Sequence, residues 1–191
     1  MSETLQKHIN KFVRISEKEF TEILTYFTLI KAAKKEDLLV AGKICKSNYF
    51  VIEGCLRLFF VNDKGIEETI QFALEHWWLS DYTSFSTQQP AEFSIQAVEK
   101  SEVMALSFSS QEEMLRRFPQ MERYFRLVHQ RAHAAFQFRI KFLYTMSREQ
   151  LYREFARQYP AFVQRIPQYL LASFLGLTPE YLSEIRSRKI S

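Results

Sequence analysis

Polar and charged side chains gather on one face of the segment that runs from Thr178 to Lys189. At helical spacing, Leu182 and Ile185 point to the opposite side, so the polar face is left free for a partner. Arg and Lys bind phosphates, and a Glu accepts a hydrogen bond from cytosine N4 in the major groove of DNA. We therefore expect nucleic-acid contacts from Thr178, Glu180, Tyr181, Ser183, Glu184, Arg186, Ser187, Arg188 and Lys189.

Two different roles are predicted within this set. The cations Arg186, Arg188 and Lys189 are assigned to backbone phosphates, which hold a protein on the duplex without reading its sequence. The acceptors Glu180, Ser183 and Glu184 are assigned to base edges, where hydrogen bonds distinguish one base pair from another.

The elements that would position this face form a helix-turn-helix. Gly176 separates two short apolar periods, and glycine favours the left-handed backbone at which a helix ends. Thr178 is a good N-cap and Pro179 a good first helical residue. Ala172, four residues before the glycine, is small enough for two helices to approach closely. The pattern predicts a supporting helix over residues 167–175 and a recognition helix over 179–189, with an ordinary helical hairpin as the alternative.

Length and composition limit the class of protein. A chain of 191 residues, 47% hydrophobic and with eighteen Phe, is typical of a globular protein with a real core. No apolar run approaches the roughly 20 residues that span a bilayer, and the amino terminus has no signal-peptide core, so no membrane and a cytoplasmic location are expected. Cys45 and Cys55 are too few for a zinc ribbon or an iron–sulfur cluster and are interpreted as buried thiols.

The net charge of +4 is distributed unevenly. Residues 1–113 contain 12 Lys and Arg against 17 Asp and Glu, a net charge of −5. Residues 114–191 contain 14 against 5, a net charge of +9. Because this basic part coincides with the predicted helix-turn-helix, it favours a polyanionic partner.

In the amino-terminal part, the spacing of the hydrophobic residues changes along the chain from that of a helix to that of strands. Residues 4–28 are predicted to be helical, with Ser16 as a possible N-cap. From about Leu38, short runs of alternating hydrophobicity follow one another at intervals of about ten residues, with glycine-containing turns between them. This spacing indicates a compact antiparallel roll or barrel.

A long helix is predicted from residue 119 to about 146, and it carries a heptad seam. A second apolar stripe lies beside the seam, so the helix needs two packing partners. One partner would be its own roll and the other the same helix of a second copy, which favours a parallel homodimer over a helix packed only on its own roll. His129 and His133 have a spacing that can chelate metal, but no third ligand is evident and no metal site is predicted. The seam residues are Met121, Phe125, Val128, Ala132, Ala135, Arg139 and Phe142.

The order of helix, roll, long helix and helix-turn-helix resembles the cyclic-AMP receptor protein/FNR (Crp/Fnr) family of transcription regulators. The resemblance covers nearly the whole chain. In the roll it is carried by Ala41-Gly42, by residues 49–54 (Tyr-Phe-Val-Ile-Glu-Gly) and by Asp63-Lys64-Gly65. In the carboxyl-terminal part it is carried by residues 171–178 (Leu-Ala-Ser-Phe-Leu-Gly-Leu-Thr).

The chain departs from this family where the cyclic nucleotide would bind. Members that bind one carry a Gly-Glu-Leu stretch and later an Arg-Ser/Thr pair, and the Arg and backbone amides neutralise the phosphate. Here Asp81-Tyr82-Thr83 aligns with the first stretch and Ala91-Glu92 with the second. The resemblance therefore implies ligand contacts from Tyr82, Thr83, Ala91 and Glu92, but the missing cation predicts a degenerate site that does not bind cyclic AMP.

Other family features are also missing. The cysteine cluster of oxygen-sensing members does not occur, and the sequence ends without the β-hairpin wing that usually follows the recognition helix. The recognition helix has a Glu at 184 where the family has a guanine-reading Arg, so the family operator is not expected to apply.

The sequence thus predicts an α+β fold. An amino-terminal antiparallel β-roll, a cyclic-nucleotide-binding-like jelly roll with flanking helices, occupies residues 1–146 together with the dimerisation helix (about 119–146). An all-α helix-turn-helix domain occupies residues 147–191. The predicted function is sequence-specific regulation of transcription, without enzymatic activity. The expected partners are double-stranded DNA, a second copy of the chain and RNA polymerase. No cofactor is predicted and the effector is unknown; the alternative is a small-molecule-binding roll protein whose helix-turn-helix binds other proteins.

Overall fold

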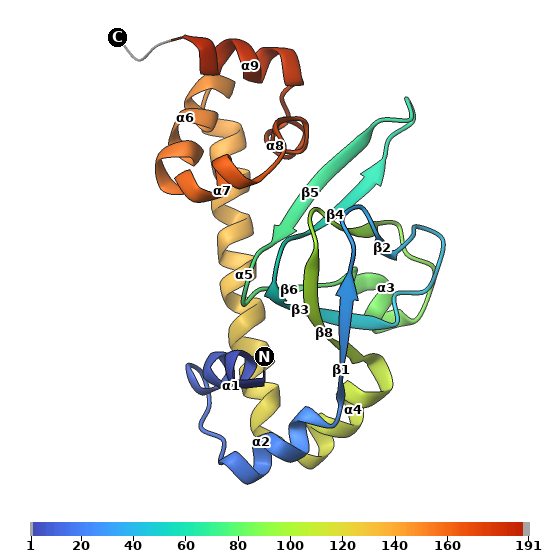
Figure 1. The fold of residues 1–191 in the computed structure, drawn as a ribbon. Helices are drawn as coiled ribbons and strands as arrows, with labels where there is room; N and C mark the ends of the chain where they lie inside the picture. The colour runs from blue at the N-terminus through green and yellow to red at the C-terminus, as the bar shows by residue number, and fades with distance from the viewer. Residues whose placement is uncertain (1, 189–191) are drawn as a thin grey trace. The chain divides into compact units, whose positions relative to one another are not determined.

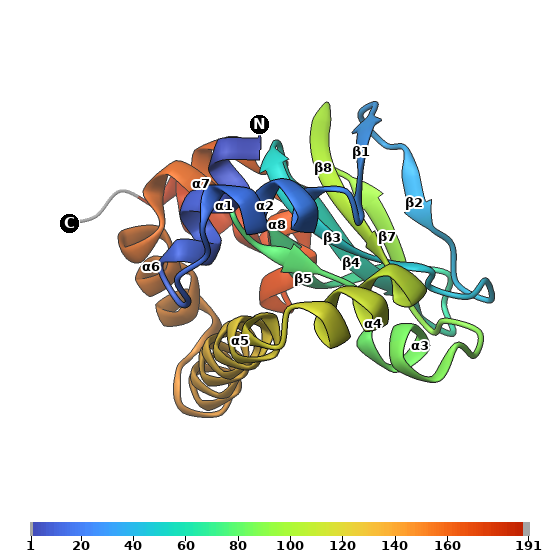
Figure 2. The same ribbon diagram turned by 90° about the horizontal axis from the view of Figure 1, so that it is seen from below.

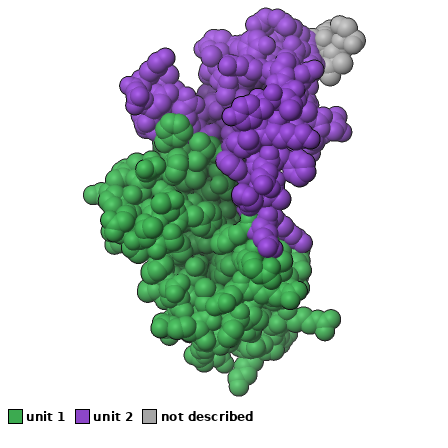
Figure 3. Space-filling model, turned by 180° about the vertical axis from the view of Figure 1, so that it is seen from behind, with its two compact units in different colours: residues 1–60, 70–129 green, residues 61–69, 130–191 purple. Residues whose placement is uncertain are grey.

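The computed structural model describes residues 2–188 (Figure 1). The chain divides into two compact units, one made of Met1–Phe60 and Ile70–His129 and the other of Val61–Thr69 and Gln130–Ser191 (Figure 3). The domain boundary expected between residues 146 and 147 concerns the limits of independently folding domains and stays a prediction.

Two four-stranded sheets form the roll, with strand orders β1-β8-β3-β6 and β2-β7-β4-β5 (Figures 1 and 2). Strand β8 pairs antiparallel with both β1 and β3, and β7 pairs antiparallel with both β2 and β4. The predicted antiparallel roll, and with it the α+β fold class, is confirmed. The strands are β1 Phe27–Ala32, β2 Asp37–Leu39, β3 Ser47–Glu53, β4 Leu56–Val61, β5 Glu67–Ala73, β6 Trp78–Leu79, β7 Ser94–Ala97 and β8 Ser101–Ser107.

The interior of the roll is packed by side chains from both sheets. Tyr49, Val51 and Leu58 are buried there, as are Ile95 and Val103. Gly54 lies at the turn after β3 with φ +100°, and a Cβ atom at this position would lie 2.7 Å from the Cα atom of Ser101. Only a glycine fits both the backbone conformation and the close approach to Ser101.

The amino-terminal helices are α1 Ser2–Asn10 and α2 Glu17–Leu24. Ser16 caps α2 in a capping box with Glu19, as the sequence indicates. The prediction that residues 4–28 are helical is wrong over residues 11–16, which separate α1 from α2, and beyond Leu24, because Phe27 begins strand β1 and pairs with Leu106. An available partner strand therefore outweighs the helical spacing at this point.

A second core of the first unit lies between helices and the sheet of β3 and β8. Its centre is Tyr124, a fully buried residue of α5 whose hydroxyl oxygen accepts from Trp78 Nε1 (2.8 Å) and is hydrogen-bonded to His8 Nδ1 (2.8 Å). Burial raises the pKa of Tyr124 above its ordinary value. The remaining helices of this unit are α3 Tyr82–Thr87, α4 Phe108–Arg117 and the first part of α5 Gln120–Thr145.

The second unit is helical apart from the tip of the β4–β5 hairpin. Ser147 caps α6 in a capping box with Gln150. Apolar residues of these helices, among them Leu151, Val163 and Leu171, are buried. The helices after α5 are α6 Arg148–Gln158, α7 Pro160–Arg165, α8 Gln168–Leu175 and α9 Pro179–Ser187.

Candidate functional site

Helices α8 and α9 meet at a tight turn centred on Gly176. Gly176 has φ +68°, and its N–H donates to the carbonyl of Ser173 (3.0 Å). The N–H of Leu177 reaches back to the carbonyl of Ala172 (2.8 Å), which closes the end of α8. The Thr178 hydroxyl then accepts from the N–H of Tyr181 (3.2 Å) and caps α9. The turn and both helices lie where the sequence predicts them.

One face of each helix in this pair is buried. Leu171, Ala172 and Leu175 of α8 are at most 4% exposed, and Leu182 and Ile185 of α9 at most 2%. The opposite face of α9 is exposed, and it carries most of the predicted DNA contacts. Exposed residues are Thr178, Glu180, Ser183, Glu184, Arg186, Ser187 and Arg188, whereas Tyr181 is half-buried and Lys189 lies outside the described residues.

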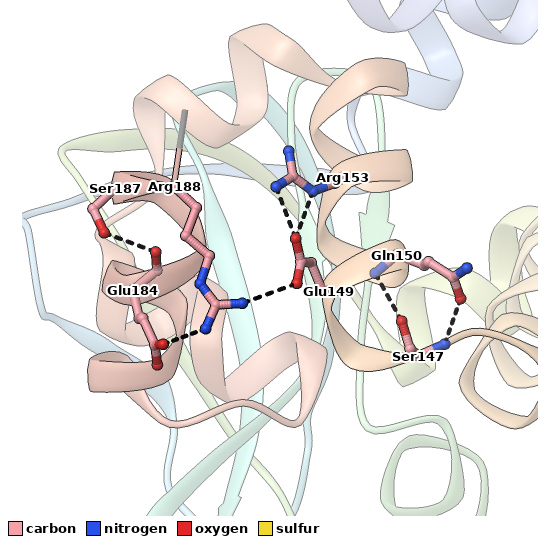
Figure 4. Close-up of polar contacts among 7 residues, drawn as sticks. All are labelled: Ser147, Glu149, Gln150, Arg153, Glu184, Ser187 and Arg188. Atoms are coloured by element: carbon pink, nitrogen blue, oxygen red, sulfur yellow. Dashed lines mark hydrogen bonds and ion pairs between the residues drawn. The ribbon is translucent and has the colours of Figure 1, made fainter. Parts of the chain in front are cut away.

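Several of these exposed residues have partners within the domain (Figure 4). Arg188 forms an ion pair with Glu184, one turn earlier on α9, and its other terminal nitrogen lies 3.6 Å from Glu149 of α6. Glu149 also accepts two hydrogen bonds from Arg153 (2.9 and 2.7 Å). Glu149 and Arg153 are not among the predicted contacts, because their proximity to α9 follows only from the packing of α6.

Helix α8 is held by two consecutive residues at its carboxyl-terminal end. The Ser173 hydroxyl oxygen accepts from the N–H of Thr69 (2.7 Å) in the hairpin tip and lies 3.1 Å from the carbonyl oxygen of Glu67. Phe174 presents its carbonyl oxygen to Arg139 of α5 (2.6 Å), whose guanidinium also lies 4.0 Å from the centroid of the Phe174 ring. Burial lowers the pKa of Arg139 to about 10, so this cation remains protonated at neutral pH.

The other predicted seam residues fall into two groups. Met121 and Phe125 are buried in the core of their own unit, and Val128 packs against that core. Ala132 and Ala135 are exposed, and Phe142 is half-buried. The dimer seam itself stays a prediction.

The predicted ligand residues lie around the amino-terminal end of α3. Asp81, which is 3% exposed, caps α3 by accepting from the N–H of Ser84 (3.0 Å). Its second carboxylate oxygen accepts from the N–H groups of Glu92 (3.2 Å) and Phe93 (3.4 Å). The aligned segments are thereby brought together. The Asp81 carboxylate therefore accepts hydrogen bonds from backbone amide groups at the position where the resemblance places the phosphate of a cyclic nucleotide.

The side chains of these residues differ in exposure. Ala91 is buried, whereas Thr83 and Glu92 are exposed. The Tyr82 ring lies edge-on to His129, with 5.0 Å between ring centroids. Tyr82 is 39% exposed, and desolvation of its hydroxyl raises its pKa; desolvation likewise lowers the pKa of His129.

Residues 2–188 contain neither a cluster of metal-ligating side chains nor a membrane-spanning helix. No three His, Cys, Asp or Glu side chains in this range are grouped so that they would hold a metal ion. None of the helices described is long and apolar enough to cross a membrane.

Comparisons with known proteins agree with this geometry. Residues 29–118 match the family described as cyclic nucleotide-binding domain. The structure of FixK2 from Bradyrhizobium japonicum is similar, with a TM-score of 0.70 at 16% identity over 85% of this chain and 83% of that chain. The c-di-GMP-responsive global regulator CLP from Xanthomonas campestris has a TM-score of 0.70 at 10% identity over 89% of each chain.

The catabolite activator protein of Thermus thermophilus is also similar, with a TM-score of 0.59 at 19% identity over 94% of this chain and 84% of that chain. A comparison with curated proteins gave no significant match. Residues 29–118 therefore match a domain of the cyclic nucleotide-binding type, and the chain as a whole shares the fold of these three solved structures. The resemblance stated from the sequence is confirmed.

We predict that cyclic AMP does not bind to this roll. Ala91 and Glu92 supply no cation for the phosphate, and Asp81 already accepts from the amide groups of Glu92 and Phe93. Titration calorimetry with cyclic AMP up to about 1 mM should give no binding heat. Micromolar binding of cyclic AMP would contradict this prediction. Thermal unfolding gives a second test, because a ligand present at about 100 times its Kd stabilises the folded state by about 2.7 kcal/mol.

Proposed function

We propose that this protein is a sequence-specific DNA-binding transcription regulator of the Crp/Fnr type. The observation that carries the proposal is the helix pair α8–α9, in which the apolar face of α9 is buried and its polar face is exposed. An exposed recognition helix of this kind fits the major groove, where its side chains reach base edges.

The charges of the carboxyl-terminal part support a nucleic-acid partner. Residues 114–191 contain 14 Lys and Arg against 5 Asp and Glu, a surplus that attracts a polyanion. On α9, Arg186 and Arg188 are assigned to phosphates, while Glu180, Ser183 and Glu184 are assigned to base edges. The effector is a ligand other than cyclic AMP, or none.

The protein acts as a homodimer in this proposal. The second half of α5 carries large apolar side chains in contact with solvent near the seam, such as Phe138 (60% exposed). Ala132 and Ala135 are also exposed, and small residues allow a second helix to approach closely. A second copy packed along this part of α5 would cover these side chains and present two recognition helices.

We predict that Ala135→Glu converts the dimer to a monomer. The substitution would place two carboxylates against each other at a two-fold interface without a partner for either charge. Gln137→Glu is the matched control, because it adds the same charge about 200° further around the exposed helix. Light scattering should report a monomer for Ala135→Glu and a dimer for Gln137→Glu and the unchanged protein. Dimers of all three would show that the seam is misassigned.

We predict that Glu180→Ala narrows the difference in affinity between operator and random DNA. An operator fragment found by mobility shift among genomic fragments would lose about 1–3 kcal/mol of binding free energy, whereas random DNA would be nearly unaffected. Arg186→Ala is the matched control. It should weaken binding to both DNAs alike and reduce by about one the slope of the logarithm of the binding constant against the logarithm of the salt concentration. Equal losses on both DNAs for Glu180→Ala would contradict the recognition-helix assignment and favour a protein-binding role for this domain.

A further inference from the structure

The cation at the end of the recognition helix is placed between two carboxylates (Figure 4). Arg188 is the C-cap residue of α9, and the two terminal nitrogens of its guanidinium face Glu184 and Glu149. Both pairs raise the pKa of Arg188, first through the hydrogen bond to Glu184. Glu184 is a neighbour along the same helix, but Glu149 comes from the first turn of α6 and is brought to Arg188 only by the fold.

Glu149 bridges two arginines. One carboxylate oxygen accepts from Nε and one terminal nitrogen of Arg153, and the other oxygen faces Arg188 at 3.6 Å. Two arginines and two glutamates therefore form a group without net charge at the end of α9. In this arrangement the Glu149 carboxylate has the position and charge that a DNA phosphate would have when it contacts Arg188.

These ion pairs are weak enough to be exchanged. The side chains of Arg188 and Glu149 are 53% and 30% exposed, respectively. Ion pairs at such exposure stabilise the fold only slightly, because water and salt screen them. A duplex, with one negative charge for about every 1.7 Å of its axis, can therefore displace Glu149 from Arg188.

We propose that Glu149 is an internal competitor for the DNA backbone, which holds Arg188 until a phosphate replaces it and so limits the phosphate-driven part of DNA binding. The proposal rests on the proposed function and concerns the regulation of that same surface. Neutralising Glu149 should leave Arg188 more available to phosphates. Binding to DNA of any sequence should then become tighter and more sensitive to salt.

The chain offers a matched control on the same helix. Glu154 also carries one negative charge on α6, but its carboxylate accepts from Arg157 and Gln158 of the same helix. Glu154→Gln therefore removes the same charge from the same helix without releasing Arg188. The Ser147–Gln150 capping box that starts α6 remains in place in both variants.

The experiment measures fluorescence anisotropy of a labelled random-sequence duplex with the full chain at salt concentrations from about 50 to 200 mM. The proteins are the unchanged chain, Glu149→Gln, Glu154→Gln, Arg188→Gln and the double variant Glu149→Gln/Arg188→Gln. Glu149→Gln should bind about two- to fivefold more tightly than Glu154→Gln and should raise the salt slope by about one. In the Arg188→Gln background the substitution of Glu149 should have no effect.

Three results would overturn the inference. An equal gain in DNA affinity for Glu149→Gln and Glu154→Gln would show only a general effect of charge. A gain that persists in the Arg188→Gln background would show that Arg188 is not the cation released. Weaker binding by Glu149→Gln, with an unchanged unfolding temperature, would show that Glu149 positions Arg188 instead of competing for it. If the unchanged chain binds no duplex at all, the proposed function itself fails, and this outcome is distinct from the other three.

Discussion

The helix-turn-helix depends on a half-buried cation on the long helix, Arg139. Arg139 donates to the carbonyl oxygen of Phe174, one of the last carbonyls of α8, which the helix itself does not satisfy, and its guanidinium covers the Phe174 ring. A charged hydrogen bond contributes about 1.5–3 kcal/mol and a cation–π contact about 0.5–2 kcal/mol. Next to it, Ser173 is held by the hairpin tip. Because α8 is fixed at this end, Gly176 can direct α9 with its polar face to solvent.

The parts of the fold that local chemistry decides could be predicted from the sequence. The capping residues Ser147 and Thr178 and the left-handed Gly176 mark helix ends within a few residues, and the structure places those ends there. Phe27 shows the limit of this reasoning. Its helical spacing is real, but its pairing with Leu106 in β8 depends on a strand almost eighty residues away along the chain.

The candidate site shows the same division. The exposed face of α9 follows from periodicity, and the Glu184–Arg188 pair follows from a spacing of four residues. Heptad spacing also identifies the face of α5 on which Arg139 lies, but not that Phe174 of the same chain contacts it. The bridging position of Glu149, and the amide groups of Glu92 and Phe93 at Asp81, depend on contacts between distant segments. Such contacts require the tertiary structure.

The central claim is that α9 reads DNA sequence as one of two helices in a symmetric protein. Selection of binding sites by the purified full chain from a pool of random duplexes, followed by sequencing, tests this claim most directly. We expect enrichment of a near-palindromic site whose half-sites are centred about 34 Å apart, one turn of the double helix. A pool that shows no enrichment, or a single half-site without symmetry, would contradict it.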